Sequence, residues 1–341
     1  MWGQCRMVIA VSARWEMTAL RHSSPEEPGI TRRRRGRAFS YHYADGRQVR
    51  DSHVLTRIRA LAIPPAWRQV WICRDPDAHL QAVGTDAAGR RQYRYHDAWR
   101  QEQDRIKFDR VTEMAERLPA FRHRLREQIA QRGLTRERVL AAASSMLDLG
   151  LLRAGGAEYD SFGLATLRAE HVTCTGDVVR CRFEAKGGKQ QDIEIHDGEV
   201  SAVVAALLRT GHEGELLRYR NGSGWKDVRA EDINDYLRDL LDCEVSAKDF
   251  RTWHATVMAA EGLARVRRPR GRLGRRRAVR RVIEEVAGRL GNTPAVALGS
   301  YVDPRVVLAF ERGRTVAADG DLEAQVIELV RGTRRGRVDR S

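Results

Sequence analysis

Four separated stretches of the sequence each supply one residue suited to chemistry at a phosphodiester. These residues are Arg153, Lys186, Arg251 and Tyr301. Two guanidinium groups can grip the non-bridging oxygens of a phosphate in bidentate fashion. A lysine can give up a proton, and a tyrosine can attack phosphorus and form a covalent ester. The order and local contexts of the four residues therefore predict a transesterification at phosphorus.

The charge that develops during such an attack explains the choice of residue types. Negative charge builds on the non-bridging oxygens, and fixed cations such as Arg153 and Arg251 can stabilise it. The leaving alkoxide needs a proton, which Lys186 can deliver. Asn292, nine positions before Tyr301, can donate a side-chain hydrogen bond to the same phosphate. A phosphotyrosyl ester keeps the energy of the broken bond, so rejoining would need no ATP.

Composition indicates the partner of this chemistry. The 341-residue chain has a net charge of +15, which favours a polyanionic partner such as nucleic acid over a merely solvated basic surface. No apolar run approaches the length of a membrane span, about 20 residues, so we expect no membrane association. We find neither a phosphate-binding loop nor a metal-ligand spacing, and we expect no cofactor. The cysteines are scattered without a CxxC pair, which fits a reducing cytoplasm.

The first part of the chain predicts a small, mostly β domain. Residues 1–30 are expected to be a disordered or mis-annotated extension, and residues 31–110 a β-rich domain with short alternating segments and turn signals. The arginine run at 32–35, which we expect in a loop, could contact phosphate or could be solvated.

Residues 111–315 predict a larger, mainly helical catalytic domain, so the fold class is α+β. One helix is expected from about Thr135 to Leu152, which places Arg153 at its C-terminal edge. A β-hairpin follows with Lys186 at its tip, and Lys189 is a nearby rival for the role of proton donor. Ser246 and Asp249 resemble a capping box that opens the helix carrying Arg251.

The C-terminal part contains further helix signals. Thr293 and Asp303 each precede a proline and predict two short helices, the first ending near Tyr301. The basic segment 265–281 is expected to be a flexible connector that lies over DNA, or only a solvated linker. Residues 316–341 are expected to form a basic tail.

The motifs together resemble those of type IB DNA topoisomerases of the bacterial and poxvirus-like group, from about residue 29 to about residue 314. The resemblance rests on RIRALAIPPAW at 57–67, GRRQYRY at 89–95, GLATL at 163–167, FEAK at 183–186 and KDFRT at 248–252. It implies relaxation of supercoiled double-stranded DNA by nicking one strand, without ATP or metal. It also implies a monomer that clamps the duplex in the cytoplasm, at the nucleoid.

The resemblance assigns roles to individual residues. Tyr301 would be the nucleophile that holds the 3′ end, Lys186 the proton donor, and Arg153 and Arg251 the stabilisers of the transition state. Many family members have histidine where this chain has Asn292, which can donate a hydrogen bond but cannot carry charge. The DNA contacts implied by the resemblance are Gln92, Tyr93, Tyr159, Thr166 and Lys248.

Two other classes of function are compatible with parts of the pattern. A tyrosine recombinase uses a similar set of residues, but its second arginine usually follows a histidine by three positions, where this chain has Lys248. A non-catalytic basic DNA-binding protein would have no reason to hold all four catalytic residue types in these contexts.

Overall fold

A computed structural model of the chain describes residues 20–36, 38–155, 162–185, 188–222, 224–266, 269 and 271–335. The chain divides into two compact units, Met1–Ile106 and Lys107–Ser341. Among the described residues, no helix combines the length and the apolar character that crossing a membrane would require.

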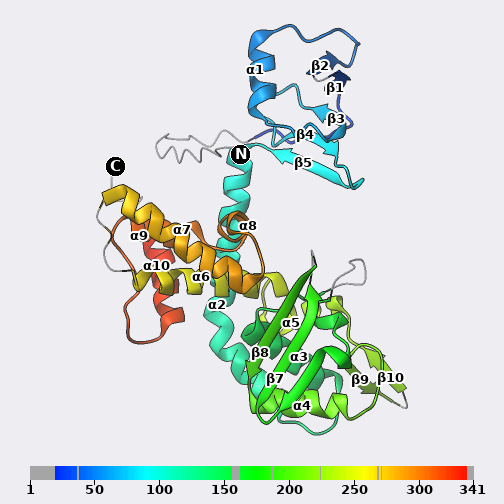
Figure 1. Cartoon of the computed structure of the whole chain (residues 1–341), viewed down its shortest axis with the longest axis vertical. Helices are drawn as coiled ribbons and strands as arrows, with labels where there is room; N and C mark the ends of the chain where they lie inside the picture. Colours follow the sequence, from blue (N-terminus) through cyan, green and yellow to red (C-terminus); the bar gives the residue numbers. More distant parts are fainter. Residues whose placement is uncertain are drawn as a thin grey trace. The chain divides into compact units, whose positions relative to one another are not determined.

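In the described part of the first unit, an antiparallel sheet packs against the helix α1 (Ser52–Ala60) (Figure 1). Its strands are β1 (Ile30–Arg35), β2 (Ala38–Tyr43), β3 (Arg68–Ile72), β4 (Leu80–Thr85) and β5 (Arg91–Tyr95), arranged in the order β2-β1-β3-β4-β5. The helix α1 begins at Asp51, whose carboxylate accepts from the amides of the first turn. Ile58 of α1 packs on Ile30, Val70 and Ile72 of the sheet, which gives this unit its own small core.

Two expectations for this region are wrong. Residues 20–30 are not an unstructured extension, because Arg21 pairs with Asp75 at 2.8 Å and Trp71 Nε1 donates to the Glu27 carbonyl at 2.9 Å. Residues 1–19 lie outside the described residues. The arginine run is strand β1, not a loop, since β1 pairs with both β2 and β3.

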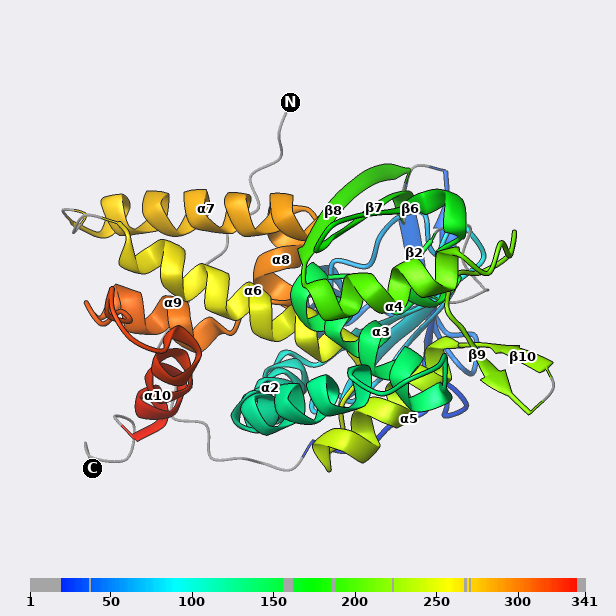
Figure 2. The same cartoon turned by 90° about the horizontal axis from the view of Figure 1, so that it is seen from below.

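The described residues of the second unit are mainly helical and include two small sheets (Figures 1 and 2). The long helix α2 (Asp97–Ile129) begins in the first unit and continues into the second. The other helices are α3 (Arg136–Gly150), α4 (Gly198–Leu208), α5 (Ala230–Leu241), α6 (Ala247–Ala264), α7 (Gly271–Leu290), α8 (Pro294–Ser300), α9 (Pro304–Glu311) and α10 (Leu322–Arg335). The strands β6 (Val172–Thr175), β7 (Val178–Ala185) and β8 (Lys189–His196) form one sheet, and β9 (Arg218–Asn221) and β10 (Gly224–Asp227) form the other.

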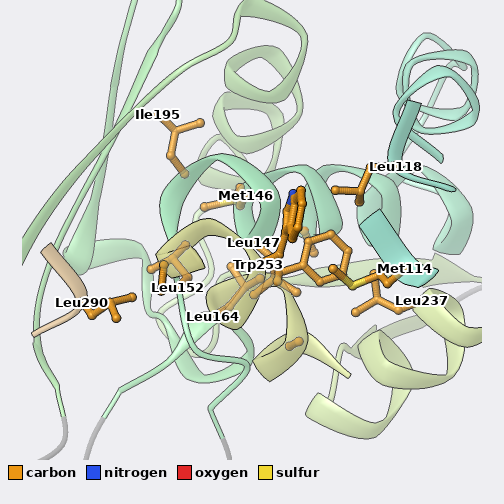
Figure 3. Close-up of a cluster of buried hydrophobic side chains, with 14 of the residues drawn as sticks. Met114, Leu118, Met146, Leu147, Leu152, Leu164, Ile195, Leu237, Trp253 and Leu290 are labelled. Carbon is orange, nitrogen blue, oxygen red and sulfur yellow. The ribbon is translucent and has the colours of Figure 1, made fainter. Parts of the chain in front are cut away.

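The core of the second unit is built around α3. Nearly all of α3 is buried, and α2, α5 and α6 pack their apolar side chains around it. Figure 3 shows Trp253 of α6 beside Leu118, Met146 and Leu147. Leu152 and Leu290 also belong to this core, so the segments that carry Arg153 and Asn292 are anchored directly on it. The α+β fold class is confirmed, including the hairpin β7–β8.

Two expectations for the C-terminal part are also wrong. The basic segment expected to be a connector is largely helical, because α7 already begins at Gly271 and lies beside α6 (Figure 2). In this helix Arg276, Arg277 and Arg280 are exposed, while Val282 and Val286 are buried. The expected basic tail contains α10, because Val326 and Val330 supply an apolar face that is fully buried.

Candidate active site

The C-terminal end of α3 sets the position of Arg153. Leu151 adopts a left-handed backbone conformation (φ 55°) that ends the helix and turns the chain toward the site. The Arg153 carbonyl then accepts from the amide of Leu164 at 2.8 Å. Gly155 and Gly163 approach so closely that a Cβ on Gly163 would lie 2.4 Å from the Gly155 Cα, so only glycine permits this contact. The segment that carries Arg153 is therefore held by the end of α3 on one side and by its contacts with Gly163 and Leu164 on the other.

Arg251 lies in the second turn of α6 and is buried. The helix starts with the expected capping box, in which Asp249 accepts from the Ser246 amide at 2.9 Å. The guanidinium donates through Nη1 to the Leu151 carbonyl and through Nη2 to the Leu290 carbonyl, the latter at 2.8 Å. Burial and the neighbouring Arg153 cation lower the pKa of Arg251. The two arginines line the same small pocket, which concentrates positive charge at one point.

Asn292 lies two residues after the end of α7 and is hydrogen-bonded to Arg153. Its Oδ1 accepts from Arg153 Nη2 at 2.9 Å. Its Nδ2 is a buried donor without a hydrogen-bond partner in the described part of the chain, and Arg251 Nε is another. Unpaired buried donors cost free energy, so two of them beside two cations suit a site that receives acceptor atoms from a ligand.

Tyr301 is held next to these residues by its backbone. It follows α8, which begins at Thr293 as expected. Thr256 of α6 donates to the Tyr301 carbonyl at 3.3 Å and accepts from the Asp303 amide at 3.1 Å. The Tyr301 ring is half-buried, with the Arg251 guanidinium 5.5 Å from its centroid. The structure thus brings together Arg153, Arg251, Asn292 and Tyr301.

The hairpin β7–β8 lies beside the same site. Lys186 directly follows the last residue of β7 in the sequence and lies outside the described residues. Its rival Lys189, at the start of β8, donates through Nζ to the Gly291 carbonyl at 3.1 Å. This hydrogen bond holds the hairpin against Gly291, the residue before Asn292. The Lys189 ammonium group therefore already has a partner within the protein.

Comparison with known families decides the identity of this arrangement. The profile described as eukaryotic DNA topoisomerase I, catalytic core, matches residues 96–304, and the profile described as bacterial DNA topoisomerase IB, N-terminal domain, matches residues 38–86. The chain belongs to the type IB DNA topoisomerases. A relative from Acanthamoeba polyphaga mimivirus, named DNA topoisomerase 1B, is 29% identical over 288 residues, which cover 80% of this chain and 85% of the relative. The resemblance inferred from the motifs is confirmed, and none of these matches favours a recombinase.

The residues expected to contact DNA differ from one another in exposure and in their contacts with the protein. In the first unit, Gln92 donates to Asp86 at 2.9 Å, while Tyr93 is 45% exposed and stacked on Tyr95. In the second unit, the Thr166 hydroxyl exchanges hydrogen bonds with the Gly163 backbone, and Lys248 is exposed with its Nζ 6.0 Å from the Tyr301 ring centroid. Tyr159 lies outside the described residues.

Several residues around the site were not identified from the sequence of this topoisomerase. Arg122, Asp148, His254 and Glu323 form a continuous set of ion pairs and hydrogen bonds behind the arginines. The sequence signal was a single carboxylate, Asp148, one turn after Ser144 and Ser145 in a helix that is otherwise largely apolar, and this by itself does not identify a partner. Within the described residues, no group of three or more His, Cys, Asp or Glu side chains is arranged to hold a metal ion.

Proposed function

We propose that this topoisomerase cleaves one strand of double-stranded DNA by transesterification to Tyr301. The phenolic oxygen attacks the phosphorus and releases its proton to solvent, while the bond from phosphorus to the 5′ oxygen breaks and that oxygen takes up a proton. The enzyme then holds a 3′-phosphotyrosyl ester. The free 5′ end can then rotate about the intact strand before its hydroxyl attacks the ester and restores the DNA. The number of bonds is conserved, so neither ATP nor an external reductant or oxidant is required.

The observation that carries this proposal is the convergence of Arg153, Arg251 and Asn292 beside Tyr301. Guanidinium groups fixed by protein carbonyls need no rearrangement when charge develops on the phosphate oxygens. Asn292 contributes a donor and holds Arg153, which is compatible with a neutral amide at a position where relatives carry histidine. Lys186 protonates the leaving 5′ oxygen.

We propose that the positive charge that stabilises the transition state comes from the arginines of the protein, so that catalysis needs no metal ion. The first unit contributes DNA contacts through Gln92 and Tyr93, and Tyr159, Thr166 and Lys248 contact phosphates near the cut. We further propose that the enzyme acts as a monomer that clamps the duplex, in the cytoplasm at the nucleoid, with residues 31–110 and 111–315 as its DNA-binding and catalytic domains.

A relaxation assay tests the proposal. The enzyme should relax positive and negative supercoils in excess EDTA and without nucleotide. Tyr301→Phe should bind duplex DNA almost normally but form no covalent adduct, because only the phenolic oxygen is lost. An adduct that persists in Tyr301→Phe would move the nucleophile elsewhere, and loss of relaxation in EDTA with recovery in magnesium would refute the metal-free mechanism. Strand exchange between two duplexes without relaxation would instead indicate a recombinase.

A further inference from the structure

A set of charged side chains lies behind the site, where it joins α2, α3, α6 and α10. Arg122 of α2 stands between two carboxylates. It donates through Nε and Nη2 to Asp148 at 2.6 and 3.1 Å, and through Nη1 and Nη2 to Glu323 at 2.6 and 3.0 Å. Both contacts are bidentate, which is the strongest geometry for an arginine–carboxylate pair.

Two residues of α6 complete this set. His254 Nε2 lies 3.0 Å from Asp148 Oδ1, and Trp253 Nε1 donates to Glu323 Oε1 at 2.9 Å. Trp253 is 1% exposed and Asp148 is 5% exposed, so these contacts lie largely within the core. Each carboxylate therefore accepts hydrogen bonds both from Arg122 and from a side chain of α6, which is His254 for Asp148 and Trp253 for Glu323.

Two members of this set, Asp148 and His254, lie close in sequence to the arginines of the site. Asp148 is three residues before Leu151, whose carbonyl accepts from Arg251, and five before Arg153. His254 follows Arg251 by three residues on α6. A contact between Asp148 and His254 consequently fixes the end of α3 relative to the turn of α6 that bears Arg251.

We propose that Glu323 is a positioning residue for DNA cleavage, acting through Arg122 and Asp148 to hold Arg153 and Arg251 at the separation that the phosphate requires. The inference rests on the roles proposed above for the two arginines. It gives α10 a function in catalysis, although this helix lies beyond the residues 96–304 matched by the catalytic-core profile.

The physical reason is the loss of an acceptor for a part-buried guanidinium. In Glu323→Gln an amide NH2 group replaces one of the two carboxylate oxygens that accept from Arg122, so the guanidinium must turn away from α10, and Asp148, its remaining carboxylate partner, must follow it. Such a shift moves the end of α3 and with it Arg153. The site tolerates little displacement, because misplacing a reacting group by about 1 Å can slow a reaction by about two orders of magnitude.

The test is single-turnover cleavage of two DNA substrates that differ only at the scissile phosphate. One carries the natural phosphodiester and the other a methylphosphonate, in which a methyl group replaces one charged non-bridging oxygen. A defect that acts through the phosphate-binding arginines should shrink on the methylphosphonate, because less charge needs to be stabilised. A merely structural defect would reduce the folded fraction and affect both substrates equally.

Glu323→Gln should slow cleavage of the phosphodiester by roughly 10- to 100-fold and cleavage of the methylphosphonate by less than about threefold. Asp148→Asn, a substitution at the buried carboxylate of the same set, should change the two rates in the same way. It provides a second test if one of the variants folds poorly. Glu328→Gln is the matched control, since Glu328 is exposed on the same helix and should leave both rates unchanged.

The outcomes separate this inference from the proposed function. If Arg153→Ala and Arg251→Ala were equally slow on both substrates, their assignment to the phosphate would be wrong and this inference would fall with it. If both alanine variants were rescued by the methylphosphonate but Glu323→Gln and Asp148→Asn were not, only the positioning role would be overturned. Rescue of all four variants supports it.

Discussion

Replacing Asn292 by aspartate separates the two functions that the structure gives this residue. Its Oδ1 accepts from Arg153 at 2.9 Å, while its Nδ2 is a buried donor without a partner among the described residues. Aspartate keeps the acceptor for Arg153 and has almost the same shape. It replaces the donor by a negatively charged oxygen. Alanine removes both groups.

The two variants should therefore differ in stability and in rate in opposite directions. Asn292→Ala loses a hydrogen bond to a charged group, worth about 1.5–3 kcal/mol of stability, whereas Asn292→Asp retains it. Loss of one donor aimed at the developing charge slows cleavage by about 10²–10³-fold in both variants. In Asn292→Asp, repulsion between a carboxylate and a phosphate about 4 Å apart adds up to about 4 kcal/mol at an effective dielectric constant of about 20.

Single-turnover cleavage and thermal unfolding check this order. We expect Asn292→Asp to unfold at or above the temperature of Asn292→Ala and to cleave DNA more slowly. Asn221→Asp, an exposed substitution on β9, is the control for the added charge. If Asn292→Asp cleaved DNA at the wild-type rate, the Nδ2 group would not face the phosphate, and Asn292 would serve only to hold Arg153.

Three further predictions concern the proton donor, the buried carboxylate and the DNA surface. Lys186→Ala should slow cleavage by about 10²–10⁴-fold and be rescued by sulfur at the 5′-bridging position, whereas Lys189→Ala should cost far less; rescue of Lys189→Ala alone would reverse the assignment. Although burial raises the pKa of Asp148, hydrogen bonds from His254 and Arg122 lower it from 3.8 to about 2. Its ionised form should thus contribute about 2 kcal/mol of stability that is complete above about pH 5 and is lost progressively as pH falls through about 2. Urea unfolding of wild type and Asp148→Asn can measure this loss, and an equal acid loss in both proteins would contradict it. The slope of log affinity against log salt should be about −0.9 per phosphate contacted, and Tyr93→Ala should weaken binding without slowing cleavage in the bound complex; a slope near zero would contradict a clamp.

Helix caps and helix ends could be predicted from the sequence because they depend on residues that are close together along the chain. The caps at Thr293, Asp303 and Ser246 and the helix that ends before Arg153 were predicted from spacing and side-chain type, and each lies where it was expected. The family and its enzyme class were also readable, because several short motifs occur in one order. Three of the four mistaken expectations fell on segments rich in arginine, where the charged residues conceal a narrow apolar face. Val326 and Val330 of α10 form such a face.

The sequence by itself determined which chemical groups are available: two arginines, a lysine, an asparagine and a tyrosine in an order typical of strand cleavage. Only the tertiary structure decided how they are held. Arg153 and Asn292 are 139 residues apart and Arg122 and Glu323 are 201 apart, and no local pattern encodes such pairs. Their contacts arise because α2, α3, α6 and α10 bury one common core, and burial then requires every enclosed charge to find a partner.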